Sequence, residues 1–455
     1  MLRFRTLSFV ALACACTPEA AEIVSSHDRH PDPGVTDPPA EPPVSDLVPD
    51  AGSPSPSPSP SPSPLPDAAP PAAGDPVPRS GGYVTDRNAY PLPPLPSLPA
   101  AGGTFRDPTF GTLIMRLTDA ADGADNQVAY AYWPTFNKDS TRISINTAQG
   151  FTLYRLDKRQ FALIDKQAVP ISPTGSILFE DAIWSGSDPD VIYGHTLAGR
   201  IYAYNAASRA YTLIKDFNAA LPGEYQWQMS MSIDDDVFAF TRRDASTYAV
   251  RGYVVWRRST DQLVIDPGPP QGVDEVHLDK TGRYLFVNTP AQGAGIVEGN
   301  VRDLVTGTVT QLMDNGPDFN PSHYDLGRGT IIGDDNWNNR LTKRSLDNPH
   351  AFTTVLDMGS DWTLAEHSSF LANDESWALV SFYVGEPPGV FRGEIVQYST
   401  DGTQQVRRLA HHRSTYLGYY DTPRANISRD GCFVAFASNW GASGRHDVFV
   451  LNLAR

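Results

Sequence analysis

The segment that decides the fold is Arg424-Ala-Asn-Ile-Ser-Arg-Asp-Gly-Cys-Phe-Val-Ala-Phe-Ala-Ser438. Its turn, Ser428-Arg-Asp-Gly431, lies between two apolar runs, as in a β-hairpin. A further apolar stretch, Asp447-Val-Phe-Val-Leu-Asn-Leu453, follows after Asn439-Trp440-Gly441. The segment therefore predicts three short strands joined by polar turns.

Weaker copies of this unit recur at roughly 45-residue intervals, about seven times between Tyr130 and Arg455, and repeats of this length indicate a propeller or a solenoid. Each copy combines a strand, a polar turn, a second strand and a looser hairpin. No long apolar period of 3.6 runs through the region, so few helices are expected. The copies begin near Trp133, Ile183, Gln228, Val276, His323, His367 and Arg424.

The last copy has one strand fewer than a blade needs, whereas the apolar stretch 112–118 stands alone before the first copy. An N-terminal strand that completes the C-terminal blade leaves no open sheet edge. We therefore predict an all-β protein, a seven-bladed β-propeller over residues 105–455, with residues 112–118 as the clasp strand.

The pattern Ser428-x-Asp-Gly431, followed by Phe433-Val-Ala-Phe-Ala-Ser438 and Asp447-Val-Phe-Val450, resembles the TolB-type, WD40-like propeller repeats of bacterial envelope proteins. Arg116-Leu-Thr118 resembles the strand that opens such a repeat. The resemblance covers most of residues 105–455. It implies the fold and says little about activity, because such blades serve binding proteins and enzymes alike.

The first 16 residues are typical of an export signal, since Arg3 and Arg5 precede an apolar stretch too short to span a bilayer. The small residues before Cys14 and Cys16 resemble a bacterial lipobox, in which the cysteine is lipidated. Cys16 is preferred because it gives the longer uncharged run, and an ordinary secretory signal is the alternative. We expect a lipid-anchored protein of the bacterial cell envelope, at the outer membrane or cell surface.

Residues 17–104 are rich in Pro, Ser and Ala, with an unbroken Ser-Pro alternation over residues 53–64. Such a composition cannot bury a core and favours extended polyproline geometry. We predict a disordered spacer between the anchor and the propeller. Proline-rich segments also serve as ligands for aromatic grooves, which is the alternative.

The composition limits the partners. The net charge is −16, and no Lys/Arg cluster interleaved with aromatic residues is present, which argues against binding to nucleic acid. Cys432 is the only cysteine in the propeller region, so we expect a buried thiol and no disulfide. We also expect a monomer.

Three histidines, His277, His323 and His367, recur about every 45 residues, each at the start of a blade, and Gln228 precedes them by nearly the same interval. Three imidazoles and an oxygen donor suit Mn, Fe, Ni or Zn. The arrangement is similar to oligogalacturonate lyases, which implies a metal that polarises a uronate carboxylate. In that resemblance Arg424 acts as the base or binds the carboxylate, although the late Gln and His cluster of those lyases is absent.

Other readings of these positions stay open. A His at a strand start often satisfies a turn, and a slip of one residue turns a side chain away from the channel. Asp181, Glu275 and Glu366 either make the channel mouth acidic or bond strand ends. Trp133 either stacks on a sugar or packs between blades, and His411 and His412 are expected to face solvent.

Two functions are compatible with these features. The favoured one is a membrane-tethered propeller that binds a glycan, a peptide or an envelope protein. The alternative is a polysaccharide lyase that acts on uronates by metal-assisted β-elimination at the channel mouth. The sequence has neither a Gly-x-Ser-x-Gly elbow nor a nucleotide-binding loop, which excludes the corresponding hydrolases and NTPases.

Cys16→Ser is expected to move the protein from the membrane fraction to the soluble fraction, because it removes the predicted lipid attachment. Cell fractionation followed by immunoblotting measures this. Cys432→Ser is the control and should leave the distribution unchanged. If Cys16→Ser stays with the membrane, the anchor is Cys14 or the chain carries no lipid.

Overall fold

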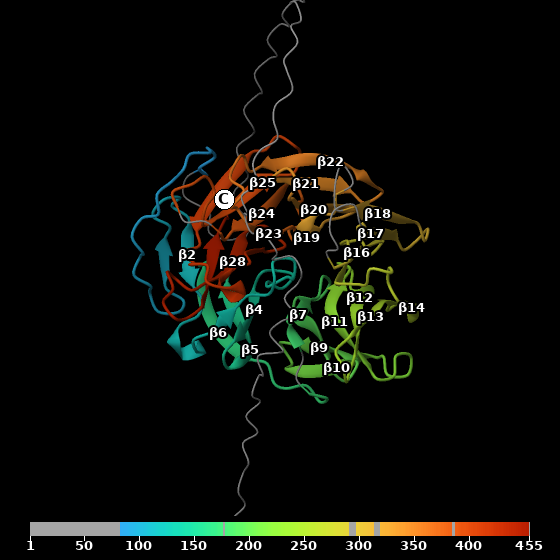
Figure 1. Cartoon of the computed structure of the whole chain (residues 1–455). Coiled ribbons are helices and arrows are strands. Elements are labelled where there is room, and N and C mark those ends of the chain that lie inside the picture. The colour runs from blue at the N-terminus through green and yellow to red at the C-terminus, as the bar shows by residue number, and fades with distance from the viewer. Residues whose placement is uncertain (1–81, 176–177, 291–296, 314–318, 385–386, 455) are drawn as a thin grey trace, which may run out of the picture. The chain divides into compact units, whose positions relative to one another are not determined.

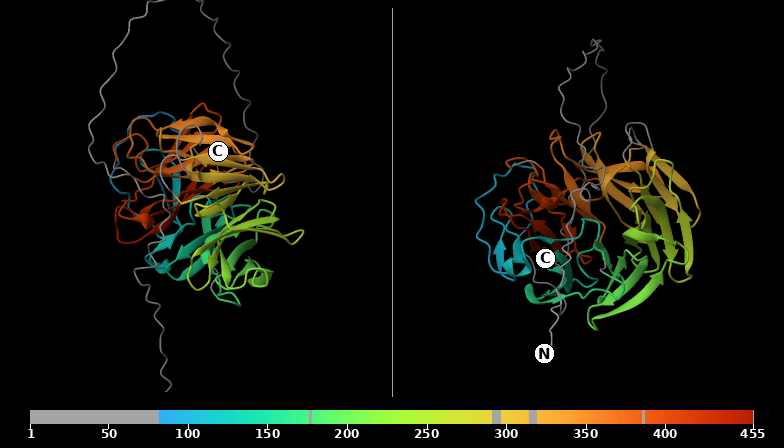
Figure 2. Two further views of the ribbon diagram at one scale, coloured as in Figure 1. Left: turned by 45° about the vertical axis from the view of Figure 1, so that its right-hand side comes forward. Right: turned by 60° about the horizontal axis from the view of Figure 1, so that its bottom comes forward.

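A computed structural model describes residues 82–175, 178–290, 297–313, 319–384 and 387–454. Within them, the strands form seven antiparallel sheets arranged as blades around a central channel, as Figures 1 and 2 show. The described residues contain no α-helix, and no helix among them is long and apolar enough to cross a membrane. The predicted seven-bladed β-propeller is confirmed.

In the first six blades the strand that comes first in the chain lies innermost. The first three blades are β3 (Asn126–Gln127), β4 (Arg142–Thr147), β5 (Gly150–Asp157), β6 (Ala162–Ala168); β7 (Leu178–Trp184), β8 (Val191–Thr196), β9 (Arg200–Asn205), β10 (Ala210–Asp216); and β11 (Glu224–Met231), β12 (Val237–Asp244), β13 (Val250–Arg257), β14 (Gln262–Asp266). The next three are β15 (Glu275–Leu278), β16 (Tyr284–Asn288), β17 (Val297–Asp303), β18 (Val309–Met313); β19 (Ser322–Leu326), β20 (Thr330–Asp335), β21 (Arg340–Ser345), β22 (Asn348–Asp357); and β23 (Glu366–Ser369), β24 (Trp377–Phe382), β25 (Glu394–Ser399), β26 (Val406–His411).

The seventh blade is closed from the N-terminal side. Its order is β27 (Asn426–Ile427), β28 (Phe433–Ser438), β29 (Asp447–Asn452), β2 (Leu113–Arg116) and β1 (Thr104–Arg106). β2 pairs antiparallel with β29, with Leu113 opposite Asn452 and Arg116 opposite Phe449. The predicted clasp is therefore confirmed, with β1 as an additional outer strand.

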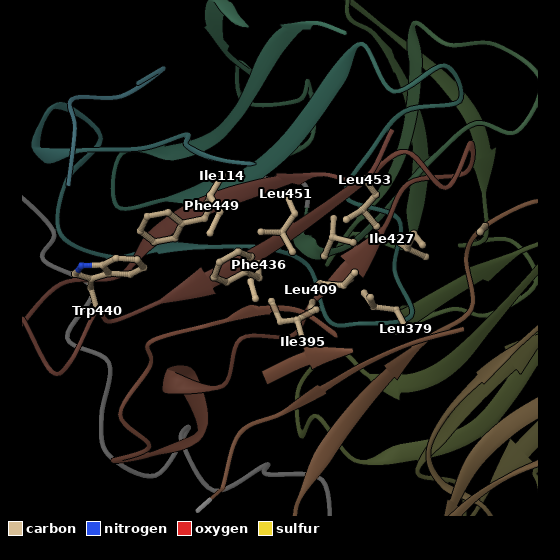
Figure 3. Packing of buried hydrophobic residues seen from close by; sticks show 14 residues of the cluster. Ile114, Leu379, Ile395, Leu409, Ile427, Phe436, Trp440, Phe449, Leu451 and Leu453 are labelled. Atoms are coloured by element: carbon tan, nitrogen blue, oxygen red, sulfur yellow. The ribbon is translucent and has the colours of Figure 1, made fainter. Parts of the chain in front are cut away.

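The apolar core lies between neighbouring blades. The middle strand β28 is buried on both faces, because each face packs against an adjacent sheet, and its sequence is accordingly apolar almost throughout. Figure 3 shows one such layer, in which Ile114, Phe436 and Phe449 of the seventh blade meet Leu379 and Leu409 of the sixth. Outer strands such as β14 alternate between exposed and half-buried residues.

The predicted boundary of the spacer at residue 104 is too late, because residues 82–103 lie on the propeller. The Tyr83 hydroxyl donates to the Leu453 carbonyl at 3.2 Å. Val84 forms a β-bridge with Arg408, whose guanidinium lies 4.6 Å from the Tyr90 ring centroid. The rest of the predicted spacer, and the predicted signal with Cys14 and Cys16, lie outside the described residues.

Two further expectations about exposure to solvent are wrong. His411 and His412 are buried, because the ring of Phe110 lies 5.0 Å from that of His411 and the propeller closes over both. Burial lowers the pKa of His411 to about 3 and that of His412 to about 4. Cys432 lies in the turn before β28 and is only half-buried, although it does pack against the core and forms no disulfide.

Ile114→Ala should lower the free energy of unfolding by about 2–5 kcal/mol, because it leaves a cavity where the clasp strand packs between the seventh and sixth blades. Ile114 is 1% exposed. The measurement is denaturant unfolding of a chain that begins at residue 82. Val305→Ala, at a side chain that is 73% exposed, is the control and should change little. Equal stability of the two variants would contradict closure by β2.

Candidate functional site

The site lies at the end of the channel where the innermost strands begin. We call this end the mouth and define it by eight residues. Glu275, His277, His323, Tyr324, His367 and Arg424 lie at or just before strand starts, and Tyr130 and Tyr132 lie in the segment that follows β3. Because every blade is an antiparallel meander, connections from one blade to the next, and from second to third strands, lie at this same end.

Of the five candidate positions, three have left-handed backbones and two are regular. Gln228, His323 and Arg424 have φ values of 54°, 43° and 45°, in the left-handed region. In β11 and β19 the pairing register shifts beside Gln228 and His323, and such a bulge redirects a side chain. His277 and His367 keep regular pairing. Equivalent positions in the repeat therefore do not point in equivalent directions.

Glu275 accepts two tyrosine hydroxyls in the mouth. Tyr324 Oη donates to its Oε1 at 2.7 Å, and Tyr132 Oη donates to its Oε2 at 2.8 Å. His277 Nε2 lies 3.4 Å from the same Oε2. Burial, followed by the Glu275 charge, raises the pKa of both tyrosines well above the usual value. The phenols therefore act as hydrogen-bond donors, and the carboxylate fixes their position.

A column of rings leads from the surface into the channel. Tyr416 lies 5.4 Å from Tyr383, Tyr383 is stacked 4.7 Å from His367, and His367 lies 5.0 Å from His323, measured between ring centroids. Burial, followed by the nearby His323 and Arg424, lowers the pKa of His367 well below its usual value. His367 is therefore neutral near pH 7.

Arg424 is surrounded by three tyrosine rings. The distances from its guanidinium carbon to the ring centroids are 4.2 Å for Tyr419, 5.4 Å for Tyr420 and 5.6 Å for Tyr130. Its Nε donates to Thr422 Oγ1 at 3.2 Å, and one terminal nitrogen donates to the Tyr419 carbonyl at 3.3 Å. Arg424 is only 2% exposed, so its charge lies behind the tyrosine rings of the mouth, where it favours an anion beside them.

The predicted metal ligands are only partly brought together. His323 and His367 are neighbours, whereas His277 lies against Tyr132, with a ring distance of 4.3 Å, and near Glu275. The side-chain oxygen Oε1 of Gln228 accepts from Thr241 Oγ1 at 3.1 Å. Among the residues that the structure describes, no group of three or more His, Cys, Asp or Glu side chains is placed to hold a metal ion. The donor set does not fit the predicted metal.

The acidic and tryptophan positions follow the structural alternative. Asp181 pairs with His195 Nε2 at 2.7 Å and accepts from the Met229 amide, so it bonds a strand end. Glu366 is buried, and burial raises its pKa. Trp133 is also buried, and its Nε1 donates to the Met229 carbonyl at 2.8 Å. None of the three offers an open surface to a ligand.

Two long side chains cross the opposite end of the channel. Arg429 of the seventh blade donates to the Trp184 carbonyl of the second at 2.9 Å. Lys280 of the fourth donates to the Ala372 carbonyl of the sixth at 2.7 Å. Between this end and the mouth lies a cavity of about 70 Å³ whose lining includes Tyr132. Such a volume accommodates a few water molecules.

The exposed aromatic residues gather around the mouth, and sequence reasoning only partly found them. Five aromatic side chains in the described part of the chain are more than a third exposed, and each lies on a connection at the mouth end. Tyrosines in connections carry no repeat pattern, so only the fold shows that they belong together. They are Tyr248, Trp337, Trp362, Tyr416 and Tyr420.

A histidine fastens the connection that carries Tyr416, Tyr420 and Arg424. This connection includes the short 3₁₀ helix η5 (Tyr419–Asp421). His446 Nε2 lies 2.8 Å from Asp421 Oδ1, and its Nδ1 lies 3.1 Å from Asp125 Oδ1. The hydrogen bond with Asp125, outweighing burial, raises the pKa of His446.

No family model matches the chain. No curated protein matches it either. Among solved structures, the oligogalacturonate lyase of Vibrio parahaemolyticus superposes with a TM-score of 0.57 at 10% identity, covering 78% of this chain and 98% of that one. An oligogalacturonate lyase in complex with manganese gives 0.57 at 10% identity, covering 79% and 97%. The WD40 repeats of RRP9 give 0.47 at 11% identity, covering 77% and 99%. The two lyases share the fold of this chain.

His446→Gln should lower the free energy of unfolding more at about pH 5.5 than at about pH 9. The folded pKa of His446 is raised, so its pairing stabilises the fold fully below the unfolded pKa of about 6.5. The stabilisation is lost as the pH rises through the folded pKa. Denaturant unfolding over this pH range measures the difference. His350→Gln, at an exposed histidine, is the control. An identical pH profile for both variants would contradict a stabilising role of the His446 hydrogen bonds.

Proposed function

We propose that this protein binds an acidic glycan at the mouth of its propeller. The observation that carries the proposal is that the five exposed aromatic side chains all lie on connections at the end of the channel where Arg424 lies, with Tyr420 beside its guanidinium. Aromatic faces pack against the apolar faces of sugar rings. A guanidinium binds a carboxylate through two parallel hydrogen bonds.

The arrangement of the rings suits a chain rather than a single sugar. Tyr420 lies beside Arg424, Tyr416 opens the column that leads to His367, and Trp337 and Trp362 lie on connections of the fifth and sixth blades. If a sugar acid bound near Arg424, these rings would be available to the neighbouring sugars of the polymer. Proteins and peptides from the envelope are the other partners that this surface would suit.

The cellular setting belongs to the same proposal. A lipid on Cys16 and the proline-rich spacer would hold a monomeric propeller at the cell envelope, within reach of surface polysaccharide. The chain's net charge of −16 disfavours nucleic acid as the ligand. An acidic glycan is compatible with this charge only because the mouth supplies a local cation, Arg424.

A uronate lyase is the second candidate, because the fold resembles that of oligogalacturonate lyases. A metal in such an enzyme would neutralise the uronate carboxylate. In this chain His323, His367 and Gln228 do not assemble into a ligand set, and guanidinium groups stay protonated in proteins, which makes Arg424 a poor base. The mouth supports binding of a carboxylate better than abstraction of a proton.

Tyr420→Ala and Trp362→Ala should each weaken binding of uronate oligosaccharides by about three- to tenfold, because each removes a stacking surface. Isothermal titration calorimetry measures the affinity. Leu213→Ala, on the outer strand β10, is the control because its side chain is equally exposed but remote from the mouth. Affinities that none of the variants changes would place the ligand elsewhere.

The same preparations separate binding from catalysis. We expect no rise in the ultraviolet absorbance of unsaturated uronates on incubation with polygalacturonate, and less than one transition-metal ion per chain by elemental analysis. An unsaturated product, lost together with the metal in His323→Ala, would favour the lyase.

A further inference from the structure

Three backbone carbonyls of the segment 91–99 accept hydrogen bonds from propeller side chains at a spacing of three residues. Arg413 Nη1 donates to the Pro93 carbonyl at 2.6 Å. Trp440 Nε1 donates to the Pro96 carbonyl at 3.2 Å, and Arg116 Nη1 donates to the Pro99 carbonyl at 2.7 Å. A polyproline II helix has three residues per turn, so these carbonyls lie along one face of it.

The burial of the segment has the same period. Tyr90, Pro93, Pro96 and Pro99 are half-buried, as is Leu98, whereas the residues from Pro91 to Leu95 apart from Pro93 are exposed. The sequence over residues 90–99 is Tyr-Pro-Leu-Pro-Pro-Leu-Pro-Ser-Leu-Pro, whose prolines fix φ at the polyproline value. Hydrogen bonding and burial thus indicate independently that one face of a polyproline II helix rests on the propeller.

The side chains that receive this face are held rigidly. Arg413 and Trp440 both have left-handed backbones, with φ values of 63° and 46°, and the Gly441 amide donates to the Arg413 carbonyl at 2.7 Å. The Trp440 ring is stacked on Phe449 with centroids 4.8 Å apart. Strained backbone of this kind is typical of ligand clamps.

Glycine is required beside the clamp. Gly441 has φ +71°, and a Cβ at that position would lie 2.7 Å from Leu95 Cδ1. The loop of the seventh blade therefore approaches the proline-rich segment as closely as its backbone allows. Arg413 and Trp440 are each more than nine-tenths buried by the contact.

We propose that Arg116, Arg413 and Trp440 form a recognition groove for a polyproline II peptide, which residues 91–99 of this chain occupy. Because the donors contact carbonyls, the groove selects backbone geometry and spacing rather than a particular set of side chains. Proline supplies the geometry with little loss of conformational entropy. A proline-rich peptide with the same spacing would then fill the groove when residues 91–99 are absent from it.

The test uses the full chain with residues 91–99 replaced by a Gly/Ser sequence of equal length. A fluorescently labelled peptide, Ala-Tyr-Pro-Leu-Pro-Pro-Leu-Pro-Ser-Leu-Pro-Ala-Ala, copied from residues 89–101, is titrated and its anisotropy recorded. It should bind this variant and leave the parent chain unbound, because the parent groove is filled at high effective concentration. Adding Arg413→Lys or Trp440→Phe should weaken binding about tenfold, because lysine cannot reproduce the geometry of the guanidinium donor and phenylalanine has no donor.

The controls distinguish specific binding of the peptide in the groove from nonspecific binding. Val305→Ala should leave the affinity unchanged, and a peptide with every proline replaced by glycine should bind about tenfold more weakly. Equal binding to the parent chain, or no binding to a replaced chain that keeps the parent's circular dichroism, would overturn the proposal.

A second measurement serves if the replaced chain does not fold. In the otherwise unchanged chain, Arg413→Lys and Trp440→Phe should speed trypsin cleavage after Arg87, whose guanidinium bonds the Asp357 carbonyl at 2.7 Å while the segment is docked. Cleavage rates equal to those of the parent and of Val305→Ala would equally overturn it.

Discussion

The inner edge of each blade must satisfy backbone amides that have no further strand to pair with, and the architecture depends on how this is done. Side chains of one innermost strand accept from amides of the next. Asp181 accepts from Met229, Ser230 from Leu278, and Asn426 from Thr135, each at 2.8 Å. This ring of bonds fixes neighbouring blades to one another, and it uses the polar residues that a channel would otherwise offer to a ligand. It explains why so many strand-start residues are structural.

The repeat and the clasp could be predicted because both depend on features that a sequence displays: apolar runs, polar turns and a missing strand. The directions of Gln228 and His323 could not, because a bulge adds one residue to a strand without changing its composition. The sequence also did not indicate that residues 82–103 pack on the propeller. Proline-rich composition indicates only that a segment cannot form its own core, whereas Pro93 and Pro96 are held by donors more than 300 positions away.

The mouth also carries groups that take no part in the bonds between neighbouring blades described above. Glu275 holds two phenols, and Arg424 lies among three tyrosine rings on a connection that His446 ties to Asp421. The aromatic surface and the cation come from connections rather than from the repeat, so they vary freely without disturbing the blades. This separation suits a scaffold whose ligand is set by a few loops.

The clasp also determines when, during synthesis, the protein can complete its fold. Arg116 and Asp447, which pair at 2.6 Å, are separated by 331 positions in the chain. During synthesis the early blades emerge and pair locally, but the ring stays open until the last strand arrives. Until then β2 has no β29 to pair with, and a chain that ends before residue 447 keeps that edge bare for pairing with another molecule. Ring closure is thus the final and most sequence-distant event of folding, so a nearly complete product is the most prone to aggregate.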